Sequence, residues 1–244
     1  MPRVLIEAAV ETPADAEAAT AGGADRLEVC AALDLGGLTP SPGVVREVQA
    51  VSPLPVVLML RPRPSDFVYT AAEVRVLRHD LDALAPLRPA GFIFGVLHPD
   101  GTLNEAACRE LIAAAAGVPC VIHRSFDRAP DPAAALETAV ALGFRRVLTS
   151  GARSTAVKGT LAVARLVELA AGRIEILPCG KVRAANAAEV IRATGCDQLH
   201  ASFAEPVPRD EGLGYRGYVQ RSRTSRAEVE ATRAALDALA LGLA

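Results

Sequence analysis

The stretch His123-Arg124-Ser125-Phe126-Asp127 follows directly after the apolar run 118–122. Its imidazole, guanidinium and carboxylate groups can each handle a proton, an anion or a metal ion. Polar side chains at the end of a buried strand are costly to bury unless they have a task or a partner. We therefore expect this stretch to belong to a functional site.

The same arrangement recurs along the chain. Glu28 and Cys30 end one apolar run, Arg61 ends another, Ser150 follows a third, and His200 lies in the last. Polar groups at the carboxyl ends of successive strands are typical of the active-site face of a (β/α)8 barrel.

Eight short apolar runs alternate with longer Ala- and Leu-rich helical patterns, which predicts parallel βαβ units with right-handed crossovers. Polar residues recur at nearly every strand end, and no G-x-G-x-x-G motif follows the first strand. Both observations favour an α/β fold of the closed TIM-barrel type over an open doubly wound sheet. Helix starts are predicted at Thr12-Pro13, Ser41-Pro42 and Asp131-Pro132. The predicted strands are 4–8, 26–29, 55–60, 91–97, 118–122, 145–148, 174–177 and 198–201, and the last helix is predicted at 224–241.

At 244 residues the chain has the usual length of one such barrel. No linker, charge block or low-complexity segment divides it, so we expect a single domain over residues 1–244. Residues 203–223 are rich in Gly, Pro and Arg, and we expect them to form a long surface loop before the last helix.

The composition excludes several classes of protein. A net charge of −2 gives no long-range field for nucleic acid or for an anionic membrane. Five cysteines without a C-x-x-C pair indicate neither a disulfide framework nor a zinc knuckle. We find no signal-peptide core and no apolar run of membrane-spanning length, so a reducing cytoplasm is the expected location.

Closure of the barrel would bring four candidate catalytic residues into its upper half: Glu28, Arg61, His123 and Asp127. Glu7 and His200 would lie with them. Buried carboxylates and an arginine could neutralise one another, and a histidine beside a carboxylate could serve as general acid or base or as a metal ligand. The alternative is a structural polar layer that only satisfies itself, since ion-pair networks also occur without a function.

Two turns could hold an anion. Gly180 and Lys181 follow the seventh predicted strand, where barrels often bind phosphate at a helix N-terminus. Ser150 and Gly151 offer a similar cradle after the sixth strand. The alternative is an ordinary helix start with solvated charges.

Cys30 and Cys179 lie at the carboxyl ends of predicted strands and could meet at the barrel mouth. Thiolates and thioethers suit a soft ion such as Cu(I), and Met59 is the one thioether available nearby. A buried cysteine that acts only as a small apolar residue is the alternative.

At these residues the chain resembles the CutC family of copper homeostasis proteins. The resemblance implies a TIM barrel, a cytoplasmic homo-oligomer and a role in copper handling, with Cys30 as a Cu(I) ligand. The family usually has another cysteine in or just after the first strand, where this chain has Glu7-Ala8-Ala9. The matching stretches are Gly23-Ala-Asp-Arg-Leu-Glu-Val-Cys30, Gly36-Gly-Leu-Thr-Pro-Ser41, Arg61-Pro-Arg63, Gly95-Val-Leu97, His123-Arg-Ser-Phe-Asp127, Arg146-Val-Leu-Thr-Ser-Gly151 and His200-Ala-Ser202.

The sequence leaves the function open between two main hypotheses. One is a cytoplasmic copper homeostasis protein that binds Cu(I) through Cys30, with Cys179 or Met59. The other is a TIM-barrel enzyme that acts by acid/base chemistry on a small anionic or phosphorylated metabolite. A third hypothesis is an oligomeric scaffold whose mouth has lost its activity.

Overall fold

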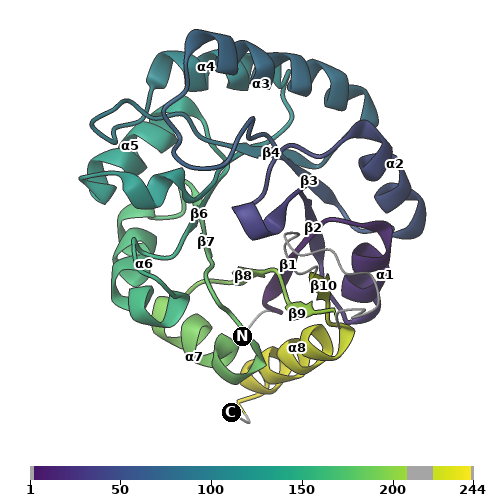
Figure 1. The fold of residues 1–244 in the computed structure, drawn as a ribbon. Helices are drawn as coiled ribbons and strands as arrows, with labels where there is room; N and C mark the ends of the chain where they lie inside the picture. The colour runs from purple at the N-terminus through teal and green to yellow at the C-terminus, as the bar shows by residue number, and fades with distance from the viewer. Residues whose placement is uncertain (1–2, 208–221, 243–244) are drawn as a thin grey trace, which may run out of the picture.

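The computed structural model describes residues 3–207 and 222–242. Eight parallel strands form a central ring, and the helices lie outside it (Figure 1). The strands are β1 Leu5–Val10, β2 Arg26–Val29, β3 Val56–Met59, β4 Gly91–Phe94, β5 Cys120–Ile122, β6 Arg146–Thr149, β7 Glu175–Pro178 and β8 Gln198–Ala201. The helices are α1 Pro13–Ala21, α2 Pro42–Val51, α3 Ala71–Leu84, α4 Glu105–Ala114, α5 Pro132–Leu142, α6 Ala156–Ala170, α7 Ala184–Thr194 and α8 Arg226–Ala240, with 3-10 turns at η1 Leu33–Leu35, η2 Ala85–Leu87 and η3 Arg124–Arg128.

The prediction of a (β/α)8 barrel is confirmed. The strands are hydrogen-bonded in the order β7-β6-β5-β4-β3-β2-β1-β8, so the first strand pairs with both the second and the last. The ends of this order, β7 and β8, face each other across the remaining gap, where Gln198 Nε2 donates a hydrogen bond of 3.1 Å to Glu175 Oε2. Each predicted strand coincides with one observed strand, with shifted ends at most of them.

The three predicted helix starts are also confirmed. The Thr12 hydroxyl accepts a hydrogen bond from the Asp15 backbone N–H, and the Ser41 hydroxyl accepts one from Val44. The Asp131 carboxylate accepts two, from the first turn of α5. Each cap satisfies backbone donors that a helix cannot pair internally, so each helix begins at a defined residue.

Alternation along the strands divides the apolar side chains into two cores. The larger core lies between the strands and the helices and includes Leu27, Leu58 and Phe92. A smaller core fills the barrel interior, which is why the barrel is packed and not a pore. The interior core consists of Cys30, Val57, Met59, Ile93, Val121, Leu148, Leu177 and Cys179.

Residues 203–223 differ in part from the predicted loop. Their described ends form an antiparallel pair of short strands, β9 Ala204–Pro206 and β10 Ser222–Thr224. The backbone N–H of Thr224 donates a hydrogen bond of 2.7 Å to Asp15 Oδ1, which ties β10 to the start of α1. Residues 208–221 lie outside the described residues, and for them the surface loop stays a prediction.

Within residues 3–207 and 222–242, no helix combines the length and the apolar character needed to cross a bilayer.

Gly159 marks the place where α6 packs most closely on the loop after β6. A Cβ at this position would lie 1.8 Å from the Ser150 carbonyl oxygen. We therefore expect Gly159→Ala to lower the free energy of unfolding by about 1–3 kcal/mol, because the helix must move away from the loop. Equilibrium urea unfolding measures this.

Gly43→Ala is the matched control, since Gly43 also lies within a helix but a Cβ there meets only the Ser41 hydroxyl at 3.7 Å. It should stabilise the protein by roughly 0.5–1 kcal/mol through helix propensity. Equal effects of the two substitutions would contradict the close packing of α6.

Candidate functional site

A cavity of about 300 Å³ opens at the carboxyl ends of the barrel strands. Its wall includes side chains from β2, β3 and β8 and from the segments that follow β5 and β7. This volume is at the lower end of the range for small-molecule sites, and it lies on the face where TIM barrels carry their active sites. The lining residues used below are Glu28, Met59, His123, Cys179, Lys181 and His200.

A chain of charged groups crosses the barrel interior beside this cavity. The strand register pairs Glu7 with His200 on β8 and with Arg26 on β2. Arg26 Nε donates a hydrogen bond to Glu7 Oε2, and His200 Nδ1 lies 2.9 Å from Glu7 Oε1. On its other side, His200 Nε2 lies 3.5 Å from Glu28 Oε2. The imidazole is thus held between two buried carboxylates.

The surroundings change the pKa values of Glu7, His200 and Glu28 in different ways. Burial alone would raise the pKa of Glu7, but the hydrogen bond from His200 and the charge of Arg26 outweigh it and lower the pKa to about 2. Burial opposes the charge of His200, yet Glu28 and Glu7 together raise its pKa. Burial raises the pKa of Glu28 to about 6, against the attraction of His200. Glu28 is therefore the member of the chain that can gain or lose a proton near neutral pH.

His123 lies in the same cavity wall and is neutral. The backbone N–H of Ser125 donates to His123 Nδ1 at 3.2 Å, so Nδ1 is an acceptor and the ring proton is on Nε2. Burial and the nearby charge of Arg61 lower the pKa of His123 to about 3. The ring of Phe67 packs against it with the ring centroids 4.6 Å apart. The result is an N–H donor of fixed orientation.

Two buried polar atoms in the cavity wall lack hydrogen-bond partners among the described residues. They are Glu28 Oε1 and His123 Nε2. Buried polar atoms are nearly always paired in folded proteins, and leaving one unpaired costs about 1–3 kcal/mol. One acceptor and one donor are therefore available to a ligand.

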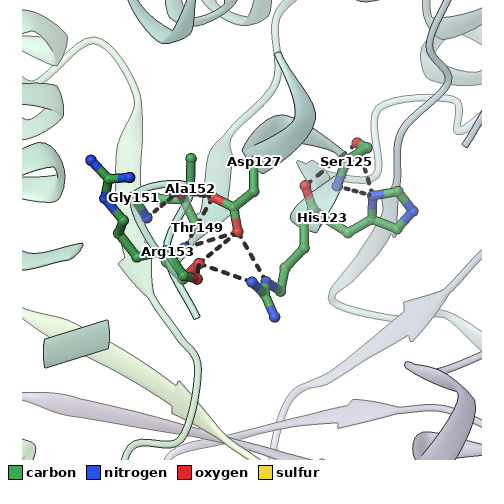
Figure 2. A network of polar contacts seen from close by, with 9 residues as sticks. His123, Ser125, Asp127, Thr149, Gly151, Ala152 and Arg153 are labelled. Atoms are coloured by element: carbon green, nitrogen blue, oxygen red, sulfur yellow. Dashed lines mark hydrogen bonds and ion pairs between the residues drawn. The ribbon is translucent and has the colours of Figure 1, made fainter. Parts of the chain in front are cut away.

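The structure does not place Asp127 in this cavity. Alternation would put it on the same face as His123, but β5 ends at Ile122 and residues 124–128 form the 3-10 turn η3. Figure 2 shows the Asp127 carboxylate among the residues after β6, on the side away from the His123 ring. It accepts hydrogen bonds from the Thr149 hydroxyl and from the backbone N–H groups of Ser150 and Ala152, at 2.5–3.2 Å. Asp127 thus holds the loop after β6.

Arg61 is not among the residues that line the cavity, and its guanidinium is paired with backbone carbonyl groups. Its guanidinium donates to the carbonyl oxygens of Leu35, Gly37 and Ser65 at 3.0–3.2 Å. It also lies over the Phe67 ring, 5.0 Å from the centroid. Arg61 therefore joins the loops after β2 and β3 and positions the ring that packs on His123.

Carboxylates of the protein itself occupy the Ser150-Gly151 turn and a backbone donor at the N-terminus of α7, which follows Gly180 and Lys181. The Ser150-Gly151 turn surrounds Asp127, and Ser150 Oγ lies 2.9 Å from Asp127 Oδ2. At the N-terminus of α7, the Ala184 backbone N–H donates to Glu228 Oε1 of α8 at 2.7 Å. Gly180 and Lys181 nevertheless line the cavity, and the exposed Lys181 side chain is available at its rim.

Cys30 and Cys179 belong to the same interior core as Met59. Burial and then the charge of Glu28 raise the pKa of Cys30 well above that of a free thiol, and burial likewise raises the pKa of Cys179. Both are therefore protonated thiols at neutral pH. In the described part of the chain, no group of three or more His, Cys, Asp or Glu side chains is arranged to hold a metal ion.

Sequence reasoning missed two residues that shape the site, Phe67 and Gly95. A Cβ on Gly95 would lie 2.0 Å from Ser125 Oγ and 3.1 Å from His123 Cε1, so a side chain there would displace Ser125 Oγ and press on the ring. A glycine at the end of a strand is a known sign of close approach by another group, and this signal was available. The packing of Phe67 on His123 depends on the path of a loop and had no sequence signal.

The neutral state of His123 can be tested by ¹⁵N NMR of the histidine ring nitrogens. An ordinary histidine, with a pKa of about 6.5, becomes protonated between about pH 8 and pH 5. The His123 signals, identified by their loss in His123→Gln, should stay those of a neutral ring with the proton on Nε2 over this interval. Protonation of His123 above about pH 5 would contradict the assignment.

Comparison with known proteins gives consistent matches over nearly the whole chain. The model of the CutC family matches residues 4–205. A CutC family protein of Caulobacter vibrioides is 44% identical over 242 residues, covering 97% of this chain and 98% of the relative. A human protein named copper homeostasis protein cutC homolog is 41% identical over 213 residues, covering 87% and 77%.

Solved structures agree with this result. The crystal structure of a CutC protein from Streptococcus agalactiae superposes with a TM-score of 0.78 at 32% identity, covering 82% of this chain and 98% of that one. A thiamine phosphate pyrophosphorylase from Pyrococcus furiosus shares only the barrel fold, with a TM-score of 0.60 at 13% identity and coverage of 97% and 96%. On the family match and the identity with its relatives, the chain belongs to the CutC family.

Proposed function

We propose that this protein is an enzyme that acts by acid/base chemistry on a small, negatively charged metabolite. The observation that carries the proposal is the pair of unpartnered buried atoms, Glu28 Oε1 and His123 Nε2, in the wall of one cavity. A ligand that accepts a hydrogen bond from His123 Nε2 and donates one to Glu28 Oε1 would supply both missing partners.

Glu28 is the group that transfers the proton. A general base works best when its pKa lies near the operating pH, and the pKa of about 6 for Glu28 meets this condition. The His200 imidazole between Glu28 and Glu7 holds the carboxylate in place and compensates its charge, while Glu7 stays ionised.

Lys181 and Arg124 are the expected contacts for the negative charge of the ligand. Both line the cavity and both side chains are at least partly exposed, but the Arg124 guanidinium also donates to Asp127 and Ser150, each at 2.9 Å, so Lys181 is the less occupied of the two. The backbone donors after β6 and at the start of α7 are occupied by Asp127 and Glu228. We therefore expect the anionic group of the metabolite at the side chains of the rim, and not at the α7 N-terminus where many barrels hold phosphate.

A polar layer that only satisfies itself fits the site less well. In such a layer the polar atoms pair with one another, as Glu7, Arg26 and His200 do. The unpaired atoms of Glu28 and His123 do not follow this pattern.

The proposal is tested by thermal shift with a panel of small carboxylates and phosphate monoesters. A compound present at 100 times its dissociation constant should stabilise the protein by about 2.7 kcal/mol. His123→Phe should abolish the shift, because it removes the donor but keeps an aromatic ring in the wall. His79→Phe, at an exposed position on α3, is the matched control and should keep it. If no compound raises the melting temperature of the unaltered protein, the proposal is wrong.

A second candidate function is Cu(I) binding, and the sulfur atoms of the interior core favour it. A Cβ on Gly37 would lie 3.1 Å from Cys30 Sγ and 3.4 Å from Met59 Cε, so these two side chains meet under the same loop. Cys179 belongs to the same core. Thiol and thioether ligands suit Cu(I), although the buried thiols must first lose their protons. The human relative's name, a copper homeostasis protein, supports the same candidate.

Anaerobic titration with Cu(I) against a competing chelator tests this second candidate. We expect one tight site per chain that is lost in Cys30→Ala. Cys108→Ala, which alters a buried cysteine on α4 outside the barrel interior, should retain the site. Binding that is equal in all three proteins, or absent from all three, would contradict a site at Cys30.

We also propose a cytoplasmic location and a homo-oligomeric assembly. All five cysteines are free thiols, which supports a reducing compartment. The assembly rests on the resemblance to the family.

A further inference from the structure

The two unpartnered atoms in the cavity wall, Glu28 Oε1 and His123 Nε2, differ in chemical character. This difference limits the kinds of reaction that the cavity can catalyse. Glu28 Oε1 is a carboxylate oxygen that can accept a proton. His123 Nε2 carries a proton that it keeps, because burial and Arg61 hold the ring neutral. A base and a neutral hydrogen-bond donor in the wall of one cavity suit abstraction of a proton from the carbon next to a carbonyl group. The donor then stabilises the oxygen on which negative charge develops.

Other reactions fit this set of residues less well. Glycoside hydrolysis needs a second carboxylate that works with Glu28. Of the other carboxylates in the cavity lining, Glu11 accepts from the Leu33 backbone N–H, Asp15 accepts from Thr12 and Thr224, and Asp34 is solvent-exposed. Attack by a thiolate needs a lowered pKa, whereas burial raises the pKa of Cys179. Proton abstraction uses only the groups that the cavity leaves unpaired.

The neutral donor also limits the kind of carbonyl group. Removing a proton beside a carboxylate gives a dianion, which calls for a metal ion or a cationic donor. Removing one beside a ketone or aldehyde gives a singly charged enolate, which a neutral imidazole can stabilise. The cavity of about 300 Å³ has room for a small metabolite of this kind.

We propose that the cavity enolises a small α-hydroxy aldehyde or ketone that also carries an anionic group, with Glu28 as the base and His123 Nε2–H on the carbonyl oxygen. The inference rests on the proposed function and names its substrate class. Glu28 takes the proton from the α-carbon, the C–H electron pair forms the carbon–carbon double bond, and the carbonyl π pair moves to the oxygen held by His123. Return of the proton to the same carbon gives exchange. Return to the neighbouring carbon, together with transfer of the α-hydroxyl proton to the oxygen held by His123, gives isomerisation. The reaction needs no oxidant or other co-reactant.

Hydrogen exchange in D₂O tests this inference directly. The protein is incubated with glycolaldehyde, dihydroxyacetone, glyceraldehyde and their phosphate esters, with EDTA present, and loss of the α-proton signal is followed by ¹H NMR. At least one compound should exchange faster than in buffer. Glu28→Gln should slow this exchange by about 10²- to 10⁴-fold, the usual contribution of a general base. Glu47→Gln, on the exposed side of α2, should leave it unchanged.

His123→Phe supplies a second variant in case Glu28→Gln does not fold, which circular dichroism shows. It should slow exchange by roughly 10²-fold, as expected for loss of one donor to a developing oxyanion. If no compound exchanges faster with the protein than in buffer, or if both variants exchange at the unaltered rate, the inference is overturned. Thermal shifts by carboxylates or phosphate esters without any exchange would overturn this inference but keep the proposed function. If neither a thermal shift nor enhanced exchange is observed, both this inference and the proposed function are wrong.

Discussion

The placement of His200 between Glu7 and Glu28 is the interaction on which the rest of the site depends. Three neighbouring strands, β8, β1 and β2, contribute these residues, and the register of the strands brings them to the same level of the barrel. Two carboxylates buried together would repel each other strongly, and the imidazole between them together with Arg26 compensates this repulsion. The pairing of β1 with β8 therefore both holds the barrel together and brings His200 to the two carboxylates.

A second feature is that carboxylates of the protein itself accept hydrogen bonds from the backbone N–H groups that could otherwise bind an anion. The turn after β6 surrounds Asp127, and the start of α7 holds Glu228 from the last helix. These carboxylates hold loops that would otherwise have free backbone donors, since such donors need partners. The groups on this face that remain available to a ligand are therefore Glu28 Oε1, His123 Nε2 and the ammonium group of Lys181.

The sequence predicted the barrel well, because its evidence was periodic and repeated. Eight apolar runs, helix caps such as Thr12 and Asp131, and polar residues at strand ends all indicated the same fold. Glu28 and His123 line the cavity, and each lies within or directly after a strand, where alternation decides the direction of the side chain. The prediction for Asp127 was wrong because alternation was continued beyond Ile122 into a 3-10 turn. The partners of Arg61 and the ring of Phe67 come from loop paths, which no local pattern encodes.

The central claim is that Glu28 and His123 bind one ligand between them. A crystal structure with glycolohydroxamate, a planar mimic of an enediolate, tests this most directly. The account predicts ligand oxygen or nitrogen atoms at about 2.6–3.2 Å from both Glu28 Oε1 and His123 Nε2. A ligand bound elsewhere, with these two atoms paired to other residues of the protein, would contradict it.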